Sequence, residues 1–424
     1  TPFRGDWKNA CECYRNWIYS LPEFRKRPVR PAWMRDSPIT LIYAVRGDGD
    51  DRGDLPANLY FPYENVLPIA DFYAEALDSR ILALPMHWEG TAPWAPPYVW
   101  PPYGGEESFA RFRDGLHERG HLLGVYCSGT AWTQTSSITS YSQEKKFAEE
   151  GLEREMMRGP QGEIDAVVCN GETLQRLGYD LCVAREWTRR TVLDEFGKLA
   201  AFGLDYVQFF DQNIGGGTLL CYSREHGHPE IPGAWQTRAM ASLQREMLDV
   251  AGEKSPVIGA EASAATPYVQ NLIYNDARVC FTFGRGMPVP GYAYVFHEFL
   301  CNFMGNQCGI HDHFDMERTP WNLLYRTAYA FHCGDMLSIL LGPGGKIFWN
   351  WGLKWDAAPL PPQEPELRLL HSLNRLRRQY PQFLFEGRMI PEFIRWETGS
   401  IPLELSHRTD RIPRVLASAR EESA

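Results

Sequence analysis

The run Leu204-Asp205-Tyr206-Val207-Gln208-Phe209-Phe210 ends on Asp211, and a second run, Val257-Ile258-Gly259-Ala260, ends on Glu261. Both runs are short and rich in β-branched and aromatic residues, and a helical pattern separates them. This pattern predicts two neighbouring parallel strands. Each acid then stands at the carboxyl end of its strand, which is the active-site face of a β/α barrel. An Asp and a Glu that face one cleft are the side chains that glycoside hydrolysis requires.

The same alternation of strand and helix extends outward from this pair. The strand candidates are Ile39 to Val45, Ile81 to Met86, Leu122 to Cys127, Tyr206 to Phe210, Pro256 to Ala260, Val279 to Phe283, Met336 to Leu341 and Ile347 to Trp351. Helical patterns lie between them at Ile69 to Leu77, Phe109 to Arg119, Glu186 to Phe202, Trp235 to Val250 and Leu323 to His332. Alternation of this kind implies a parallel sheet. We therefore expect an α/β fold, a (β/α)8 TIM-like barrel that the last three strands close.

The spacing of these elements predicts three parts of the chain. Residues 1–38 form a lead-in segment, and residues 39–356 form the catalytic barrel. An insertion at about 128–204 follows the third strand and is far longer than an ordinary crossover, so we expect it to carry recognition. Residues 357–424 hold a Leu-periodic helix through Leu367, Leu370, Leu373 and Leu376, and then the start of a β appendage.

The composition of the chain argues against nucleic acid and membranes as partners. The 424 residues carry a formal net charge of −10, and the basic residues are scattered rather than gathered into a stripe, which argues against nucleic acid. No apolar stretch approaches the ~20 residues that cross a bilayer, so we expect no membrane partner. The chain opens on Thr1-Pro2-Phe3. We expect a soluble protein, secreted or periplasmic with its signal removed, and leave its oligomeric state open.

Metal and cofactor motifs are weak. The ten cysteines show no C-x-x-C pair and no spacing typical of zinc sites, and most of them are expected to be buried thiols. The pairs His226-Gly227-His228 and His311-Asp312-His313 do not follow apolar runs, as the His pair of a metal-dependent barrel hydrolase does. Nucleotide-cradling and dinucleotide-binding motifs are missing from the sequence. We expect neither a metal nor another cofactor.

Several other residues are candidates for substrate binding because they lie at or just beyond predicted strand ends. Aromatic rings bury large area and stack on the flat C–H faces of sugars. For each candidate the alternative is an ordinary structural role in packing, in a helix cap or in a salt bridge at the barrel rim. The candidates are Trp88, Glu89, Tyr126, Trp132, Gln212, His226, His228, Arg285 and His297.

A family resemblance rests on the same stretches. Residues 203–212, residues 222–229 and Gly259-Ala260-Glu261 resemble a group of uncharacterised bacterial barrel proteins, the DUF6259-type glycosidase-like proteins. Arg4-Gly5-Asp6-Trp7 and Trp33-Met34-Arg35-Asp36 look similar too. That group in turn resembles endo-α-N-acetylgalactosaminidases and other retaining α-glycosidase barrels. The resemblance implies that Asp211 is the nucleophile and Glu261 the acid/base.

The sequence thus predicts a retaining glycoside hydrolase that acts on an α-linked, galacto-configured sugar in an oligosaccharide or glycoconjugate. An amide donor at Gln212 would hold Asp211 ionised, and the apolar context of Glu261 would raise its pKa. Two alternatives stay open. One is a non-catalytic carbohydrate-binding barrel that kept the cleft. The other is a metal-dependent hydrolase, in which His226 and His228 converge with a carboxylate around an ion.

Overall fold

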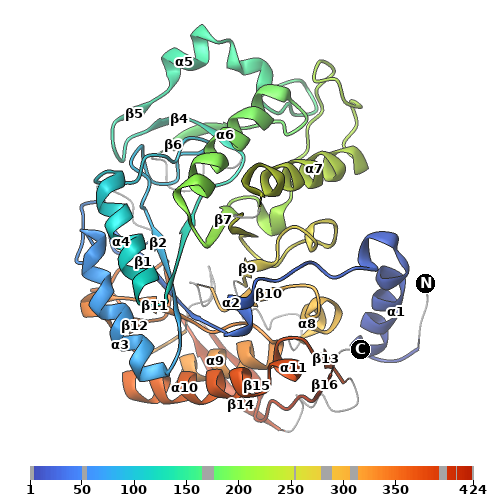
Figure 1. Ribbon diagram of the computed structural model, residues 1–424. Coiled ribbons are helices and arrows are strands. Elements are labelled where there is room, and N and C mark those ends of the chain that lie inside the picture. Colours follow the sequence, from blue (N-terminus) through green and yellow to red (C-terminus); the bar gives the residue numbers. More distant parts are fainter. Residues whose placement is uncertain are drawn as a thin grey trace. The chain divides into compact units, whose positions relative to one another are not determined.

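The structure is a computed structural model that describes residues 4–49, 55–164, 176–252, 255–277, 289–305, 314–390, 399–406 and 408–422 (Figure 1). The chain divides into two compact units. Unit 1 comprises residues 1–42, 69–82 and 276–424, and unit 2 comprises residues 43–68 and 83–275. Strands β1 (Ile39–Ala44) and β2 (Ile81–Met86) contribute residues to both units.

The sheet of unit 2 has the order β1-β2-β3-β7-β8, where β3 is Leu122–Tyr126, β7 is Tyr206–Phe210 and β8 is Val257–Ala260. Strand β7 pairs in parallel with β3 on one side and with β8 on the other. Every residue of these five strands is buried, which explains why they read as continuous apolar runs rather than as alternating ones. The structure therefore has strands where the sequence predicted the first five.

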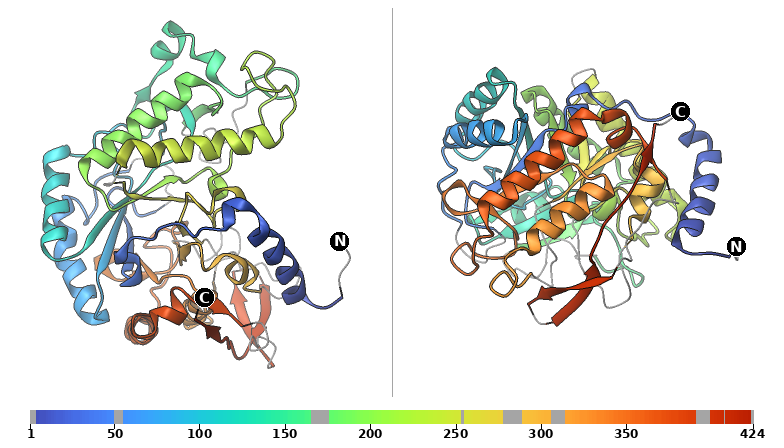
Figure 2. Two further views of the ribbon diagram at one scale, coloured as in Figure 1. Left: turned by 45° about the vertical axis from the view of Figure 1, so that its right-hand side comes forward. Right: turned by 90° about the horizontal axis from the view of Figure 1, so that it is seen from below.

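Three long helices of unit 2 connect these strands, and α6 and α7 lie side by side (Figures 1 and 2). Helix α6 buries Val192, Phe196 and Leu199, which the helical period places on one face. It ends at Gly203, whose φ of +87° is the left-handed conformation that commonly closes a helix. The helical elements of unit 2 are η2 (Tyr63–Val66), α4 (Glu106–Glu118), α6 (Glu186–Phe202), η4 (Ile214–Gly216), α7 (Ala234–Ala251) and η6 (Thr266–Tyr268), and the short strand β9 is Tyr274–Asp276.

The long insertion between β3 and α6 folds around a core of its own. Its three-stranded antiparallel sheet has the order β5-β4-β6, from strands Tyr141–Ser142, Ala131–Ser136 and Arg176–Asp180. Helix α5 (Glu144–Glu149) and the turn η3 (Leu152–Glu155) follow β5. Trp132 packs in a buried cluster with Leu152, Met156 and Leu181. The insertion is thus a folded subdomain rather than an open loop.

The sheet of unit 1 departs from the expected closure. Strand β11 (Ser338–Leu341) pairs in parallel with β1, as a barrel requires. The next strand, β12, is only Ile347–Phe348 and pairs with β11 in the antiparallel direction, so the parallel strand predicted over 347–351 is wrong. The reason is the tight turn at Gly344 and Gly345, whose φ values of +66° and +73° reverse the chain at once.

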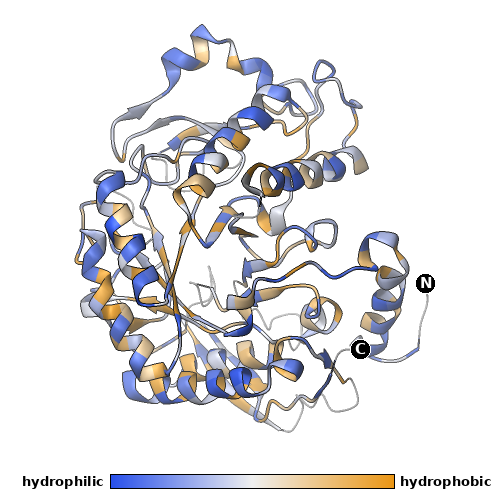
Figure 3. Cartoon of the chain, viewed as in Figure 1, coloured by the Kyte–Doolittle hydropathy of each residue, from blue (hydrophilic) through white to orange (hydrophobic). Residues whose placement is uncertain are grey.

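Helix α10 (Gln363–Gln379) contacts α9 (Asn322–Cys333) in unit 1, and much of its ribbon has the hydrophilic colour in Figure 3. Its buried face matches the predicted leucine stripe only in part, because Leu370 is buried but Leu376 is exposed. The other buried residues of the helix are Glu366, Asn374 and Arg377. Asn374 and Arg377 bond to backbone carbonyls of neighbouring loops, which offsets their burial. The other elements of unit 1 are α1 (Trp7–Ser20), η1 (Pro22–Phe24), α2 (Ala32–Arg35), α3 (Leu67–Leu77, which begins in unit 2), α8 (Gly291–Phe296), β10 (Cys301–Phe303), η8 (Pro343–Gly345) and α11 (Pro381–Leu384).

Two antiparallel strand pairs end the chain: β13 (Arg388–Met389) with β16 (Arg420–Glu421), and β14 (Ser400–Leu405) with β15 (Arg408–Pro413). The architecture is thus mixed α/β with a parallel sheet. The strand predicted over 279–283 lies outside the described residues, and the predicted domain limits stay a prediction. Among the helices that the structure describes, none is long and apolar enough to cross a membrane.

Candidate active site

Asp211 and Glu261 follow neighbouring strands at the same level of the sheet of unit 2. Phe210 of β7 is the register partner of Ala260 of β8, and each acid comes one residue later. The backbone confirms this alignment, because the N–H of Glu261 donates to the carbonyl of Phe210 at 2.9 Å. Both acids are largely buried, with 7% of Asp211 and 8% of Glu261 exposed. The two predicted acids therefore share the carboxyl edge of two adjacent strands.

A bulge in β7 turns a buried amide toward Asp211. Gln208 pairs with Gly259 and Phe210 pairs with Ala260. Strand β7 therefore has one more residue than β8 between these two pairs. The Gln208 side chain is fully buried, and its Nε2 donates to Oδ1 of Asp211 at 3.2 Å. The hydroxyl of Tyr206 lies 3.3 Å from Oε1 of Gln208 and 3.0 Å from the carbonyl oxygen of Tyr274, so its one proton is shared between these two acceptors. A hydrogen bond to a carboxylate favours its ionised form.

Sequence reasoning missed Gln208 as a site residue. It assigned the role of amide donor to Gln212, which the structure places directly after Asp211 in a half-buried position. The signal was present, because Gln208 is the one uncharged polar amide inside an otherwise apolar and aromatic run. A buried amide needs partners for its donors and acceptor, so its place within a strand indicates a polar group nearby.

Glu89 is a third buried acid close to Asp211. It follows β2 and is 2% exposed. Its Oε1 accepts a hydrogen bond from the backbone N–H of Trp94 at 3.4 Å, and its Oε2 has no hydrogen-bond partner among the described residues. Burial raises the pKa of Glu89 to about 7, and the charge of Asp211 adds to this rise, whereas the Arg46 guanidinium opposes it. Glu89 therefore holds its proton up to near-neutral pH.

Loop residues after β3 and β7 bind each other around these acids. Oδ1 of Asn213 accepts a hydrogen bond from the backbone N–H of Thr130 at 2.8 Å. Gly129 has a φ of +81°, and a Cβ there would lie 2.1 Å from Oδ1 of Asn213, so only glycine fits this approach. The N–H of Gly215 donates to the carbonyl of Glu261 at 2.7 Å. These bonds hold the two loops against the carboxyl edge of the sheet.

Cys127, at the end of β3, lies within the same electrostatic environment. Burial raises the pKa of its thiol well above the ordinary value, and the charges of Glu89 and Asp211 contribute to the rise. Its backbone N–H donates to the carbonyl of Gln208 at 2.9 Å, and its carbonyl accepts a hydrogen bond from the backbone N–H of Asp211. The thiol of Cys127 is therefore neutral.

The predicted aromatic contacts lie mainly in the core. The ring of Trp88 stacks on Phe109 of α4 at 5.8 Å between centroids, and its Nε1 donates to the carbonyl of Tyr126. Trp132 is fully buried in the core of the insertion, where its Nε1 donates to Oε1 of Gln134 at 2.7 Å. These contacts support a packing role for both tryptophans. The Tyr126 side chain is 4% exposed, and its backbone is the register partner of Gln208.

His297 and Arg285 are two further predicted contacts. His297 lies in unit 1, where it is buried, and burial lowers its pKa well below the ordinary value, aided by the charges of Arg420, Arg377 and Arg30. A neutral, buried histidine of this kind supports a packing role. Arg285 and the pair His311 and His313 lie outside the described residues.

The remaining two predicted contacts, His226 and His228, lie beside two cysteines rather than beside a carboxylate. Sγ of Cys221 is 3.5 Å from Nδ1 of His226. Cys182 and His228 complete a group whose ligand atoms all lie within 4.8 Å of one another. Within the part of the chain that the structure describes, this is the one such group of His, Cys, Asp or Glu residues. A metal-dependent hydrolase would instead bring a carboxylate to these histidines.

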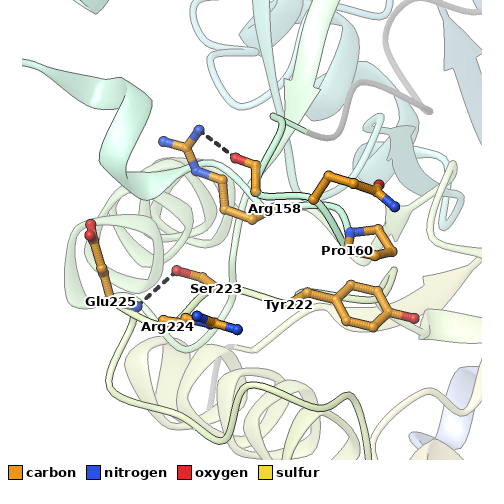
Figure 4. A pocket seen from close by; sticks show the side chains of 8 residues that line it. Arg158, Pro160, Tyr222, Ser223, Arg224 and Glu225 are labelled. Atoms are coloured by element: carbon orange, nitrogen blue, oxygen red, sulfur yellow. Dashed lines mark hydrogen bonds between the residues drawn. The ribbon is translucent and has the colours of Figure 1, made fainter.

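A cavity of about 470 Å³ opens between the insertion and the loop before α7. In Figure 4, Arg158 and Pro160 lie on one wall, and Tyr222 and Arg224 lie on the other. The N–H of Tyr222 donates to the carbonyl of Arg158 at 2.8 Å, which joins the two walls. Neither Asp211 nor Glu261 lines this cavity, so it is separate from the paired acids.

Comparison with known proteins agrees with the predicted resemblance. Residues 1–306 match the family model described as "Domain of unknown function (DUF6259)". No curated protein matches the sequence. Among solved structures, the α-N-acetylgalactosaminidase NagBb from Bifidobacterium bifidum in complex with Gal-NHAc-DNJ is similar, with a TM-score of 0.65 and 13% identity over 96% of this chain and 64% of that one. The ligand-free form gives a TM-score of 0.63 and 14% identity over 96% and 62%.

Other glycoside hydrolases share the fold. An α-galactosidase from Thermus thermophilus, in complex with p-nitrophenyl α-D-galactopyranoside, gives a TM-score of 0.53 at 13% identity and covers 95% of this chain and 70% of that one. An α-amylase from Geobacillus thermoleovorans gives 0.54 at 12% identity over 93% and 97%. The chain spans less than two thirds of the length of NagBb. At such identities the likeness concerns the fold, and it confirms the glycosidase-like architecture that the motifs indicated.

Proposed function

Because this chain belongs to the DUF6259 family and shares its fold with α-glycosidases, we propose that it is a retaining glycoside hydrolase. Asp211 is the nucleophile and Glu261 the general acid/base. Glycosidase folds also serve unrelated roles, so the proposal depends on the site rather than on the fold. We further propose that the parallel strands belong to a closed β/α barrel, as the likeness to glycosidases of that architecture supports.

The register of β7 and β8 is the observation that carries this proposal. Asp211 and Glu261 each follow one of a pair of register partners on adjacent parallel strands. Adjacent strands lie about 4.7 to 4.9 Å apart. Retaining glycosidases need a separation of about 5 to 5.5 Å between carboxyl groups, whereas inverting enzymes need about 6.5 to 9.5 Å for an intervening water. Acids on neighbouring strands at one level therefore favour retention.

Each acid has a distinct part in the proposed reaction. The Asp211 carboxylate, held ionised by Gln208, attacks the anomeric carbon while Glu261 gives its proton to the glycosidic oxygen. The bond to the leaving group breaks and a glycosyl ester forms on Asp211. Glu261 then removes a proton from a water, which attacks the ester and releases the sugar with its anomeric configuration retained. Oε2 of protonated Glu89 has no hydrogen-bond partner among the described residues, and it would form a hydrogen bond with a hydroxyl of the substrate.

The substrate we propose is an α-linked galacto-configured glycoside, from an oligosaccharide or a glycoconjugate. The similar NagBb structures are those of an α-N-acetylgalactosaminidase, and the Thermus thermophilus structure is that of an α-galactosidase with an aryl α-galactoside. The two classes of substrate differ at one position of the sugar, so aryl α-N-acetylgalactosaminides and aryl α-galactosides are the first compounds to test.

A panel of aryl α- and β-glycosides tests the proposal, with the anomeric product followed by NMR. Wild type is expected to hydrolyse one α-glycoside with net retention, and Asp211→Asn is expected to lose that activity. Glu186→Gln, which changes an exposed acid in the first turn of α6, is the matched control and keeps it. Activity that survives Asp211→Asn, or inversion of the product, contradicts the assignment.

A second arm separates the roles of the two acids. Glu261→Ala removes the acid, so hydrolysis of unactivated glycosides is expected to fall about 10²- to 10⁴-fold, the usual contribution of general acid–base catalysis. Aryl glycosides with good leaving groups need little protonation and are expected to lose less. Added azide replaces the water that Glu261 activates and gives a glycosyl azide of retained configuration. Absence of all turnover in wild type, with sugar binding preserved, would instead favour the carbohydrate-binding barrel.

A further inference from the structure

Four side chains from two distant segments of unit 2 converge on one another. Cys182 follows strand β6 of the insertion, and Cys221, His226 and His228 lie in the loop between η4 and α7. Both cysteines and His226 are buried. The spacing in the sequence shows no zinc pattern, because 38 residues separate the first cysteine from the second. The fold, rather than a local motif, brings the four together.

The distances fit a tetrahedral metal centre. Zinc binds thiolate sulfur at about 2.3 Å and imidazole nitrogen at about 2.0 to 2.1 Å, so a tetrahedral site separates such a sulfur and nitrogen by about 3.6 Å. The separation of Sγ of Cys221 and Nδ1 of His226 is 3.5 Å. All four ligand atoms lie within 4.8 Å of one another, so small side-chain movements suffice to place them around one ion.

The hydrogen bonding of His228 leaves the lone pair of one ring nitrogen available to a metal. Its Nδ1 lies 2.8 Å from the carbonyl of Pro229, which requires the proton on Nδ1 and leaves the lone pair on Nε2. That Nε2 is buried and has no hydrogen-bond partner in the part of the chain that the structure describes. The ring stacks on Trp235 with centroids 3.7 Å apart. Metal-binding histidines commonly donate their other ring N–H in this way.

The cysteines lie in an apolar environment suited to a closed site. Cys182 and Cys221 pack with Met157, and Leu219 and Trp235 lie against this cluster. The thiolate is the form that binds metal. Two thiolates and one Zn²⁺ are together neutral, so binding would remove the cost of a buried charge.

We propose that Cys182, Cys221, His226 and His228 bind one Zn²⁺ in a structural site. Four protein ligands fill the coordination sphere, so the ion has no open position for a water or a substrate. The ion would join the insertion to the loop between η4 and α7. The proposal of a zinc site is independent of the proposed glycosidase activity, because it depends only on these four side chains and their geometry.

A disulfide between Cys182 and Cys221 is the rival interpretation. It would use both sulfurs but would leave the two histidines without a reason to face them. The two states differ in mass and in metal content. The full chain is therefore purified under reducing conditions from zinc-supplemented medium, desalted, and analysed for metal content and intact mass.

We expect about one zinc per chain in wild type, and a cobalt-substituted protein with the absorption of a tetrahedral thiolate complex. Cys182→Ser and His228→Ala are expected to bind zinc at least about tenfold more weakly. Cys301→Ala, a buried thiol of unit 1, and Cys13→Ser, an exposed one, are the matched controls and retain the metal. His228→Cys keeps four ligands and is expected to restore zinc and to change the cobalt spectrum.

Measurements on wild type keep the proposal testable if the ligand variants fail to fold. Wild-type chain that holds no zinc after loading, or whose cobalt spectrum shows no thiolate ligation, overturns the proposal. A mass lower by two hydrogens, with the bond mapped to Cys182 and Cys221 after purification without reductant and zinc binding absent after reduction, establishes the disulfide instead. Loss of zinc in Cys301→Ala to the same extent as in Cys182→Ser also contradicts the assignment.

Discussion

The amide of Gln208 in β7 donates to Oδ1 of Asp211 across 3.2 Å, although Asp211 lies three positions further along the chain, directly after the strand. In a regular strand, residues three apart point to opposite faces. The bulge between Gln208 and Phe210 changes this alternation, so that both side chains face the same side. The contact between donor and acid is therefore a consequence of the irregular pairing of β7 with β8.

Replacing Gln208 by leucine tests this contact. A hydrogen bond to a charged group contributes about 1.5 to 3 kcal/mol, so kcat is expected to fall roughly 10- to 100-fold. Loss of the donor also raises the pKa of Asp211, so the acidic limb of the pH profile of kcat moves to higher pH. Gln134→Leu, a buried amide of the insertion, is the control and keeps the wild-type profile. Equal profiles for the two variants would contradict the proposed role.

Glu89→Gln tests the buried acid beside Asp211. The folded chain holds a proton on Glu89 up to its pKa of about 7, whereas the unfolded chain loses it near 4.5. Between these values the native state binds more protons, so the contribution of Glu89 to the free energy of unfolding falls as the pH rises through this window. The loss is on the order of 3 kcal/mol when complete. The amide of Glu89→Gln does not ionise, so the variant does not undergo this loss of stability.

Thermal unfolding at pH 4, below both pKa values, and at pH 8.5 measures this effect. The unfolding midpoint of Glu89→Gln is expected to match wild type at the lower pH and to exceed it at the higher. Because the charge of Asp211 contributes to the raised pKa, the gap is expected to shrink in an Asp211→Asn background. Parallel curves for wild type and Glu89→Gln at all pH values would show that Glu89 titrates normally.

Glu366→Gln makes the corresponding test in unit 1. Burial raises the pKa of Glu366 to about 8, and the hydroxyl of Thr327, which donates to Oε2 at 3.2 Å, only partly offsets this. The sign is the same as for Glu89, since the folded chain retains a proton that the unfolded chain has lost. The variant is expected to unfold at a higher temperature than wild type at pH 9 and at the same temperature at pH 4, below both pKa values. A lower midpoint at pH 9 would contradict the expectation.

Gly259→Ala tests the close approach beneath Glu261. A Cβ at this position would lie 2.0 Å from the carbonyl oxygen of Tyr274 and 2.3 Å from the hydroxyl of Tyr206. The backbone oxygen cannot rotate away, so β8 must shift, and both the unfolding midpoint and the activity are expected to fall. In Gly197→Ala the nearest atom is 3.7 Å away, so that substitution in α6 is tolerated. It is expected to add up to about 1 kcal/mol of helix stability.

The sequence was sufficient for the strands that carry the acids, because buried parallel strands leave unmistakable apolar runs. It was insufficient where conformation depends on a few glycines, as at Gly344 and Gly345, which turn β12 back against β11. Aromatic residues near strand ends were equally ambiguous. Trp88 and Trp132 have the composition of sugar contacts, yet the structure buries both in packed clusters.

Contacts between distant segments were beyond reach from spacing alone. Nothing in the sequence aligns Cys182 with the His226 and His228 pair, because the intervening helix and strand must fold before these side chains meet. The partnership of Gln208 with Asp211 was hidden for another reason, since the regular strand period places them on opposite faces. The residues most informative about the site were therefore those that break a local rule.

The additional residue in β7 also bears on how relatives of this chain are compared. Phe209 is the residue that β7 has and β8 does not match. A homologue with one deletion in this strand would regain the regular alternation, and its aspartate would then point to the opposite face of the sheet. An alignment that places a gap there would still superimpose the aspartates in a column. The length of this strand is therefore a criterion for annotating homologues that the identity of the aligned acid does not supply.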